Sequence, residues 1–210
     1  MQGTEYMPRI YVKCLPVGDF QENCYLVINA ETRECLIVDP GADGECIIRT
    51  AQEYKPVAVL LTHAHWDHIG AVDAVCGRFA IPLYVHEADV PKLTDSMKNV
   101  ARQFGYDVTV STRPIALRGG ETLSLAGMEI RVLHTPGHSA GSVCYLLPDG
   151  QGVLTGDTLF AHGYGRTDFA DGSFHELKES LRALFHLTPR QVAYPGHEEA
   201  GTVGRDPVEG

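Results

Sequence analysis

The sequence lacks the features that carry a protein into or across a membrane. Residues 1–13 contain no apolar core of a signal peptide. No run in the chain approaches the ~18 consecutive apolar residues of a membrane span. We therefore expect a cytoplasmic protein with no membrane partner.

Closely paired cysteines are also missing. The six cysteines, at positions 14, 24, 35, 46, 76 and 144, include no Cys-x-x-Cys pair. An intracellular compartment would keep them reduced. Cys24 and Cys144 lie in apolar, strand-like segments, so we interpret most of the cysteines as small core residues.

Positive charge is scarce and scattered. The chain has 17 Lys and Arg against 27 Asp and Glu, a formal net charge of −10. Such a chain would repel a phosphate backbone, so we expect no nucleic-acid partner. A length of 210 residues with 44% hydrophobic content is enough for one core, and we predict a single domain spanning residues 1–210.

What the sequence does contain is a dense group of metal-binding side chains. His63, His65, Asp67 and His68 follow the apolar run 57–61, which is typical of a strand buried on both faces. Residues i and i+2 of an extended segment point to the same side, so the first two histidines can share one ion. Imidazole and carboxylate donors suit zinc, iron or manganese rather than calcium.

The rest of the chain alternates between predicted strands and helices. Hydrophobic patterns predict strands over 10–15, 24–29, 34–39, 57–61, 83–85, 123–125, 128–133, 142–147, 152–155 and 191–194. They predict helices starting after Asp43, over 68–75 and near Ser173, where Glu176 completes a capping box. The apolar stripe of this last helix is expected to include Phe174. Residues 86–113 are predicted to form one or two short helices in a surface insertion.

Periodicity alone supports an α/β fold with a mixed sheet, and a doubly wound parallel sheet is the competing architecture. Asp39, at the end of a predicted strand, fits a turn residue, and the family resemblance described next equally implies an outer carboxylate beneath a metal site. His134, Thr135 and Asp168 are further candidates for orienting the imidazoles.

Four segments together resemble the metallo-β-lactamase superfamily. They are His63-Ala64-His65-Trp66-Asp67-His68, residues 135–142, residues 154–158 and residues 194–197, in family order. Gly165-Arg166-Thr167-Asp168 and the segment 17–25 are most similar to the glyoxalase II (hydroxyacylglutathione hydrolase) branch. The resemblance implies a four-layer αββα sandwich with two mixed β-sheets. Glu198 departs from the branch, whose members usually have glycine there.

The resemblance also implies a set of seven ligands for two divalent ions, zinc first, with iron or manganese possible. His63, His65 and His138 would hold the first ion. Asp67, His68 and His197 would hold the second, and Asp157 would bridge both. Asp67 and Asp157 are the predicted catalytic carboxylates.

This ligand set predicts a metal-dependent hydrolase acting on small S-acyl thioesters similar to S-lactoylglutathione. Two ions sharing Asp157 and a solvent oxygen would generate a metal-bound hydroxide for the attack. A thiolate leaves without a strong acid because the thiol pKa is about 8.5. No obvious general acid is visible in the sequence.

Three other functions compete with thioester hydrolysis. A mononuclear-iron persulfide dioxygenase shares most ligand positions and the run 165–169, whereas the segments 68–71 and 195–197 favour the hydrolase. A non-enzymatic metal-binding protein is disfavoured by the complete ligand set. A secreted β-lactamase is disfavoured because that branch has a signal peptide and usually cysteine at the position of Asp157.

The expected substrate preference follows from the short segment after His197. Only 13 residues follow it, whereas glyoxalase II continues into a helical region that contacts glutathione. We expect weak discrimination between thiol carriers and a partly disordered tail over 198–210. Phe20 and Tyr164 are candidate substrate contacts, and His162 is predicted to lie in a loop at the site. The role of Trp66 and the oligomeric state stay open.

Overall fold

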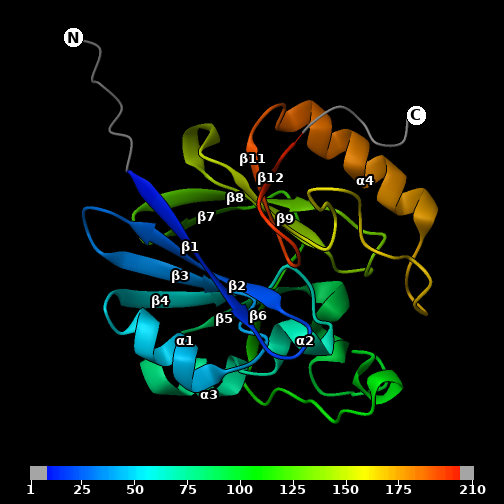
Figure 1. Cartoon of the computed structure of the whole chain (residues 1–210), viewed down its shortest axis with the longest axis horizontal. Coiled ribbons are helices and arrows are strands. Elements are labelled where there is room, and N and C mark those ends of the chain that lie inside the picture. Colours follow the sequence, from blue (N-terminus) through cyan, green and yellow to red (C-terminus); the bar gives the residue numbers. More distant parts are fainter. Residues whose placement is uncertain (1–8, 204–210) are drawn as a thin grey trace.

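Two β-sheets pack face to face with helices on their outer surfaces (Figure 1). The computed structural model describes residues 9–203. Between the sheets lies an apolar layer that includes Val27, Leu36, Ile130 and Tyr145. Separate apolar layers lie between each sheet and its helices. This arrangement confirms the predicted αββα sandwich with two mixed sheets.

The first sheet has 6 strands in sequence order. They are β1 (Ile10–Val17), β2 (Glu22–Asn29), β3 (Glu34–Val38), β4 (Lys55–Leu60), β5 (Leu83–His86) and β6 (Pro114–Leu117). The first three strands pair antiparallel, and β3 to β6 pair parallel. Every residue of β2 is buried, which explains its unbroken apolar character between the polar ends.

The second sheet also has 6 strands, in the order β12-β11-β10-β9-β8-β7. They are β7 (Thr122–Leu125), β8 (Met128–His134), β9 (Val143–Leu146), β10 (Val153–Gly156), β11 (Val192–Pro195) and β12 (Gly201–Thr202). Only β10 and β11 pair in parallel. Their carboxyl ends therefore point the same way, toward the first sheet's ligand loop.

The helices cover the outer faces of the two sheets (Figure 1). They are α1 (Gly44–Ala51), α2 (Trp66–Ile69), α3 (Val72–Phe79) and α4 (Phe174–Leu187), with short 3₁₀ helices η1 (Glu87–Lys92), η2 (Ala101–Phe104) and η3 (Pro148–Gly150). α1 and α3 bury apolar residues against the first sheet, and α4 buries Leu177, Leu181 and Leu184 against the second. None of the helices between residues 9 and 203 has the length and apolar composition needed to cross a membrane.

Three expectations about helices were wrong in detail. Asp43 begins α1 without a side-chain cap, because its carboxylate instead accepts a hydrogen bond from the Gly18 N–H at 2.8 Å. The helix predicted over 68–75 is divided into α2 and α3. Phe174 is 48% exposed and does not join the apolar stripe of α4, although Ser173 does accept the capping bond from the Glu176 N–H.

The segment 86–113 is not a surface insertion. It contains two short helices as predicted, but Asp89, Asn99 and Ala101 are completely buried. The described part of the tail, up to residue 203, packs on the second sheet. β12 pairs with β11, and Val203 is buried in the layer beneath α4. The remaining tail residues, 204–210, lie outside the described part of the chain.

Candidate metal centre

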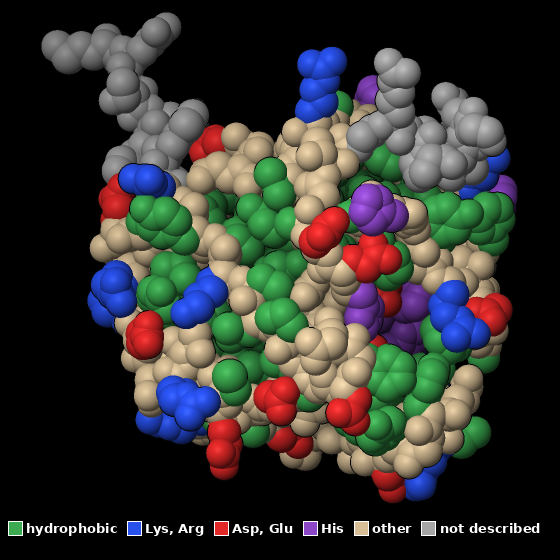
Figure 2. Space-filling view, in the orientation of Figure 1, with side chains coloured by type: hydrophobic (Ala, Val, Ile, Leu, Met, Phe, Trp, Pro, Cys, Tyr) green, Lys and Arg blue, Asp and Glu red, His purple; other side chains and the backbone are tan. Residues whose placement is uncertain are grey.

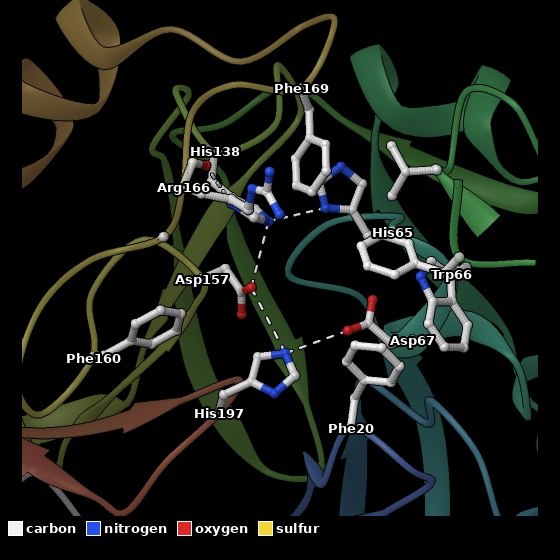
Figure 3. Close-up of a pocket in the computed structure, with 13 residues that line it drawn as sticks. Phe20, His65, Trp66, Asp67, His138, Asp157, Phe160, Arg166, Phe169 and His197 are labelled. Atoms are coloured by element: carbon white, nitrogen blue, oxygen red, sulfur yellow. Dashed lines mark hydrogen bonds and ion pairs between the residues drawn. The ribbon is translucent and has the colours of Figure 1, made fainter. Parts of the chain in front are cut away.

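The seven predicted metal ligands, called the donors below, come together where the strands of both sheets end. His63, His65, Asp67 and His68 follow β4, on the loop into α2 and on its first turn. His138 lies on the loop after β8, and Asp157 and His197 come directly or almost directly after β10 and β11. Open sheets commonly place ligand sites at such carboxyl ends. Figure 3 shows Asp157 between His138 and His197, facing Asp67.

The donor atoms form overlapping groups in which all atoms lie within 4.8 Å of one another. One group is His63, His65 and His138; a second is His63, His68 and Asp157; a third is Asp67, His68 and His197. Asp157 reaches toward both ends of the cluster. Its Oδ2 lies 3.4 Å from His138 Nε2 and 3.8 Å from His197 Nε2, and its Oδ1 lies 3.5 Å from His68 Nε2.

Several of these atoms have no hydrogen-bond partner although they are buried. They are Nε2 of His63, His65 and His68, and Oδ1 of Asp157. The Nδ1 atoms of His68 and His138 face oxygen acceptors, on Asp39 and on the Arg166 carbonyl. In neutral His68 that hydrogen bonding leaves the Nε2 lone pair directed at Asp157, an arrangement of acceptor against acceptor that a shared cation relieves. His138 Nε2 lies 3.4 Å from Asp157 Oδ2 and also 2.9 Å from His65 Nδ1, so nitrogen and oxygen ligand atoms converge there. The residues present therefore fit a metal site.

The electrostatics of the histidines agree with this fit. Burial lowers the pKa of His63 and His65 well below the usual value, so both imidazoles are neutral donors at pH 7. Burial also acts to lower the pKa of His68, but the charge of Asp157 and the hydrogen bond with Asp39 raise it well above that value. The carboxylates thus attract positive charge to this end of the cluster, whether a proton or a metal ion supplies it.

Asp39 lies directly beneath His68 and behaves as an outer carboxylate. Its Oδ2 is 3.1 Å from His68 Nδ1, and its two oxygens accept hydrogen bonds from the Thr62 N–H at 2.7 Å and from the Thr62 hydroxyl at 2.5 Å. The same Thr62 hydroxyl lies 3.1 Å from His63 Nδ1. One buried carboxylate therefore orients donors on both sides of the loop.

The segment 17–25 supports the last ligand loop from across the molecule. The Asn23 N–H donates to the Gly196 carbonyl at 2.8 Å, and its side-chain amide donates to the carbonyls of Pro195 and Glu198. The Tyr25 hydroxyl donates to the Pro195 carbonyl at 2.8 Å. β2 thereby fixes the turn that carries His197, which explains why Asn-Cys-Tyr belongs with the ligand motifs.

Two glycines allow the close approach of these loops. Gly156 adopts a φ of +48°, and a Cβ there would lie 2.4 Å from the Thr62 hydroxyl oxygen. A Cβ on Gly196 would lie 2.3 Å from Asp157 Oδ1. Any larger residue at either position would push the loops apart.

Sequence reasoning missed a buried network that joins two ligand loops. Asp89, on η1, accepts hydrogen bonds from the Ala64 N–H at 2.7 Å, from the Gly141 N–H at 2.9 Å and from the Ser139 hydroxyl. Ala64 separates His63 from His65, whereas Ser139 and Gly141 come directly after His138 on the same loop. The carboxylate thus ties together the loops that carry the first group of donors.

Lys92, one turn further along η1, provides the opposite charge in this network. Its ammonium group lies 3.2 Å from Asp89 and 2.7 Å from Asp171, and it also contacts the Ser139 hydroxyl. Lys92 is only 5% exposed, so its stem and charge are enclosed by the protein. No local spacing signals these residues, because Asp89 and Ser139 are 50 positions apart.

Glu22 is a second buried carboxylate that sequence reasoning missed. Both of its oxygens lack a hydrogen-bond partner, and one lies 3.7 Å from His68 Nδ1. Burial raises the pKa of Glu22 well above its usual value. Its position beside Asp39 is a tertiary consequence of β2 packing next to β3 and has no signal in the local sequence.

The other residues singled out in the sequence separate into two sets. Trp66 and Phe20 line the cavity above the donors. Tyr164 and His162 are not among the residues that line it, and His162 is exposed and pairs with Glu199. Asp168 forms a two-bond ion pair with Arg166, whose backbone carbonyl faces His138, so Asp168 acts on the donors only indirectly.

The two remaining candidates for orienting the imidazoles hold backbone loops. The His134 ring bonds the Ala140 carbonyl, and the Thr135 hydroxyl bonds the Thr158 hydroxyl.

The donors lie at one side of a cavity of about 390 Å³. Figure 2 shows histidine side chains at the bottom of a hollow whose lower rim is made of hydrophobic side chains. The residues lining the cavity are Phe20, His65, Trp66, Asp67, Val100, Phe104, His138, Asp157, Phe160, Gly165, Arg166, Phe169 and His197. Polar donors and aromatic rings thus share one accessible space.

The chain belongs to the metallo-β-lactamase superfamily, whose family model matches residues 17–197. It is 38% identical over 187 residues to the probable metallo-hydrolase YqgX of Bacillus subtilis (strain 168), covering 87% of this chain and 88% of that protein. It is 32% identical to the hydroxyacylglutathione hydrolase GloC of Haemophilus influenzae (strain ATCC 51907 / DSM 11121 / KW20 / Rd), covering 93% and 94%.

Two solved structures are similar over almost their whole length. The BLEG-1 B3 metallo-β-lactamase superposes with a TM-score of 0.87 at 37% identity, covering 92% of this chain and 94% of that chain. TTHA1623 in a di-iron-bound form superposes with a TM-score of 0.82 at 35% identity, covering 91% and 95%. The superfamily binds metal ions, and the class of protein defined by this fold and these His/Asp clusters is a metallo-hydrolase.

Proposed function

We propose that this protein hydrolyses small S-acyl thioesters with two divalent metal ions, zinc first, and iron or manganese as alternatives. The observation that carries the proposal is the position of Asp157 between two groups of donors at the side of the cavity. His63, His65 and His138 would hold one ion. Asp67, His68 and His197 would hold the other, and Asp157 would contact both.

Such ions, when bound, polarise a substrate carbonyl and lower the pKa of water toward neutrality. The chain's own part is to orient the donors and to take up a proton. Asp67 and Asp157 are the carboxylates that line the cavity, so they are placed to accept the proton of an attacking water. Asp39 and the Arg166 carbonyl hold His68 and His138 with their Nε2 atoms toward the centre.

The chemistry of the cavity favours a good leaving group. Among the described residues that line it, the titratable groups are the candidate ligands and Arg166, and no separate side chain is placed as a general acid. A thiolate leaves unprotonated because the thiol pKa is about 8.5, whereas an amine must be protonated first. GloC, a hydroxyacylglutathione hydrolase by description, supports the same substrate class.

The deciding experiment measures thiol release by protein loaded with zinc, iron or manganese. The substrates are S-lactoylglutathione and an S-acyl N-acetylcysteamine, and thiol release is followed with a disulfide dye. We expect kcat/KM above about 10⁴ M⁻¹ s⁻¹ for at least one thioester. Elemental analysis of the same sample should give about two ions per chain. Absence of thiol release with all three metals would overturn the proposal.

Two rival activities are measured on the same preparations. The likeness to a B3 metallo-β-lactamase structure favours a test with a chromogenic cephalosporin. The run Gly165-Arg166-Thr167-Asp168-Phe169, which resembles persulfide dioxygenases, favours a test of oxygen consumption with glutathione persulfide. One iron per chain together with oxygen consumption would replace the hydrolase by a dioxygenase.

A further inference from the structure

The cavity has an aromatic side that the proposed hydrolysis does not explain. Phe20, Trp66 and Phe104 line the cavity beyond the donors. The centroid of the Phe20 ring lies 5.1 Å from that of Trp66 and 5.5 Å from that of Phe104, both in edge-to-face geometry. Figure 3 shows the Phe20 and Trp66 rings on the side of Asp67, with the Phe160 ring on the opposite side of the centre. We call Phe20, Trp66 and Phe104 the aromatic wall.

The aromatic wall is exposed although its rings are large and apolar. Phe20 is 44% exposed and Phe104 is 39% exposed. Single exposed apolar residues are ordinary, whereas rings that gather at the mouth of a cavity mark a binding surface. The wall faces the same space as Asp157 and His197, so its occupant is a group attached to the reacting centre.

The backbone behind the wall is fixed in place. The side-chain amide of the buried Asn99 donates hydrogen bonds to the backbone carbonyls of Lys92 and Val108. The backbone carbonyl of Asn99 accepts a hydrogen bond from the Trp66 N–H at 3.0 Å. Val100 follows with a φ of +62°, an uncommon conformation for a β-branched residue, and its side chain lines the cavity. The surrounding structure therefore holds this segment against the Trp66 backbone.

Charge at the cavity argues against a strongly anionic occupant. Arg166 is the one cationic side chain other than histidine among the described lining residues. Its guanidinium makes two 2.6 Å bonds to Asp168, and these bonds lower the pKa of Asp168 to about 2. The positive charge is thus already compensated, while Asp67 and Asp157 add negative charge. Glutathione, with two carboxylates, would find no free cation here.

We infer that the aromatic wall binds an uncharged apolar group of the substrate, an aryl or branched acyl chain. The inference rests on the proposed thioester hydrolysis, and it names the substrate class: aryl-acyl or branched-acyl thioesters on a small neutral thiol. Burial of one phenyl ring against the wall gives a preference of about 10- to 100-fold over an acetyl group.

Kinetics on the metal-loaded protein give the first test. Phenylacetyl and acetyl thioesters of N-acetylcysteamine share one leaving group, so the ratio of their kcat/KM values reports acyl recognition. We expect a ratio of at least about 10 in favour of phenylacetyl, and a fall of the ratio by about 10-fold in Phe104→Ala. Phe174→Ala, an exposed ring on α4 outside the cavity lining, is the matched control and should leave the ratio unchanged.

Binding without turnover gives the second test. Trp66 is the only tryptophan of the chain, so its fluorescence reports directly on the wall. A phenethyl thioether of N-acetylcysteamine cannot be hydrolysed. It should change the Trp66 fluorescence at a concentration at least about 10-fold lower than the ethyl thioether requires. Phe104→Ala should reduce that difference, and Phe174→Ala should not.

The two tests separate failure of this inference from failure of the proposed function. Hydrolysis without a phenylacetyl preference, or with a preference for glutathione thioesters, would overturn the aromatic wall as acyl site. Absence of thioester hydrolysis with tight phenethyl binding would overturn the hydrolase and leave the apolar site standing. Equal binding of both thioethers would overturn the inference whatever the kinetics show.

Discussion

The two sides of the cavity are held by different kinds of contact. On the metal-ligand side, buried groups from distant loops position the histidines. Asp39 contacts the His68 ring, and Asp89 ties together the loops of His65 and His138. On the aromatic side, half-exposed rings contact one another. A change on the metal-ligand side should therefore alter metal binding and turnover, whereas a change on the aromatic side should alter which acyl group is accepted.

The largest effect is expected at Asp157. Asp157→Asn removes the charge shared by both donor groups, so turnover should fall about a thousandfold or more, which is about 4 kcal/mol. The free energy of unfolding of metal-free protein should change by less than about 1.5 kcal/mol, because the apolar layers are untouched. Thiol-release kinetics, elemental analysis and urea titration measure the three quantities.

Asp149→Asn is the matched control for this change. Asp149 is exposed at a hairpin with a φ of +57°, a conformation that asparagine also adopts readily. The activity and metal content of the Asp149→Asn variant should equal those of the unchanged protein. An Asp157→Asn protein that kept about two ions and normal turnover would remove Asp157 from the centre of the site.

The buried network should show the next largest effect. Asp89→Asn leaves Lys92 without its fully buried partner, so the free energy of unfolding should fall by about 3 kcal/mol. Because Asp89 joins two ligand loops, apparent metal affinity should also fall about 10- to 100-fold. Urea unfolding and competition with a chromogenic chelator measure these losses.

Asp171→Asn sharpens this result, because Asp171 contacts the same lysine from a side chain that is 31% exposed. Its loss of stability should stay below about 1 kcal/mol. Equal losses in the two variants would show that burial of Asp89 is not what makes it important.

Metal removal should destabilise the protein by an amount that depends on free ion concentration. If the clustered donors bind only in the folded chain, zinc at about one hundred times its dissociation constant adds about 2.7 kcal/mol for each site. Thermal unfolding in a chelator and in buffered zinc measures this difference. An unchanged melting temperature would contradict a metal site built from these residues.

A change on the aromatic side is expected to have the smallest effect on metal binding. Phe20→Ala removes two edge-to-face contacts of a ring that is 44% exposed, so the free energy of unfolding should fall by about 1 kcal/mol. Metal content should stay at about two ions per chain. A loss of metal in this variant would show that the two sides of the cavity are not independent.

The donors were predictable because their signals are local. His63, His65 and Asp67 lie within a few positions after one apolar strand, and the later motifs also follow strands. The alternation of strands and helices was sufficient for an α/β fold, but only the family resemblance predicted two sheets. The structure confirms both sheets, and the use of the seven residues as ligands stays a prediction.

What sequence reasoning missed depends on contacts between distant segments. Asp89 and Glu22 look like ordinary charged residues until packing brings them beside the donors. β6 was not among the predicted strands, because it has only 4 residues and begins at Pro114. Proline is nevertheless tolerated as the first residue of a strand at the edge of a sheet. Asp43 failed as a cap because a distant N–H, that of Gly18, competes for its carboxylate.

The hydrogen bonds from Asn23 and Tyr25 to the Pro195 carbonyl also bear on how the chain folds. They join residues 172 and 170 positions apart, close to the largest separation within the described chain. Contacts of such long range form late, because the loop they close is entropically costly. During synthesis, the loop of His197 can dock on β2 only after the residues up to that loop have left the ribosome. Residues 63–68 are therefore synthesised well before His197, which completes the second group of candidate ligands.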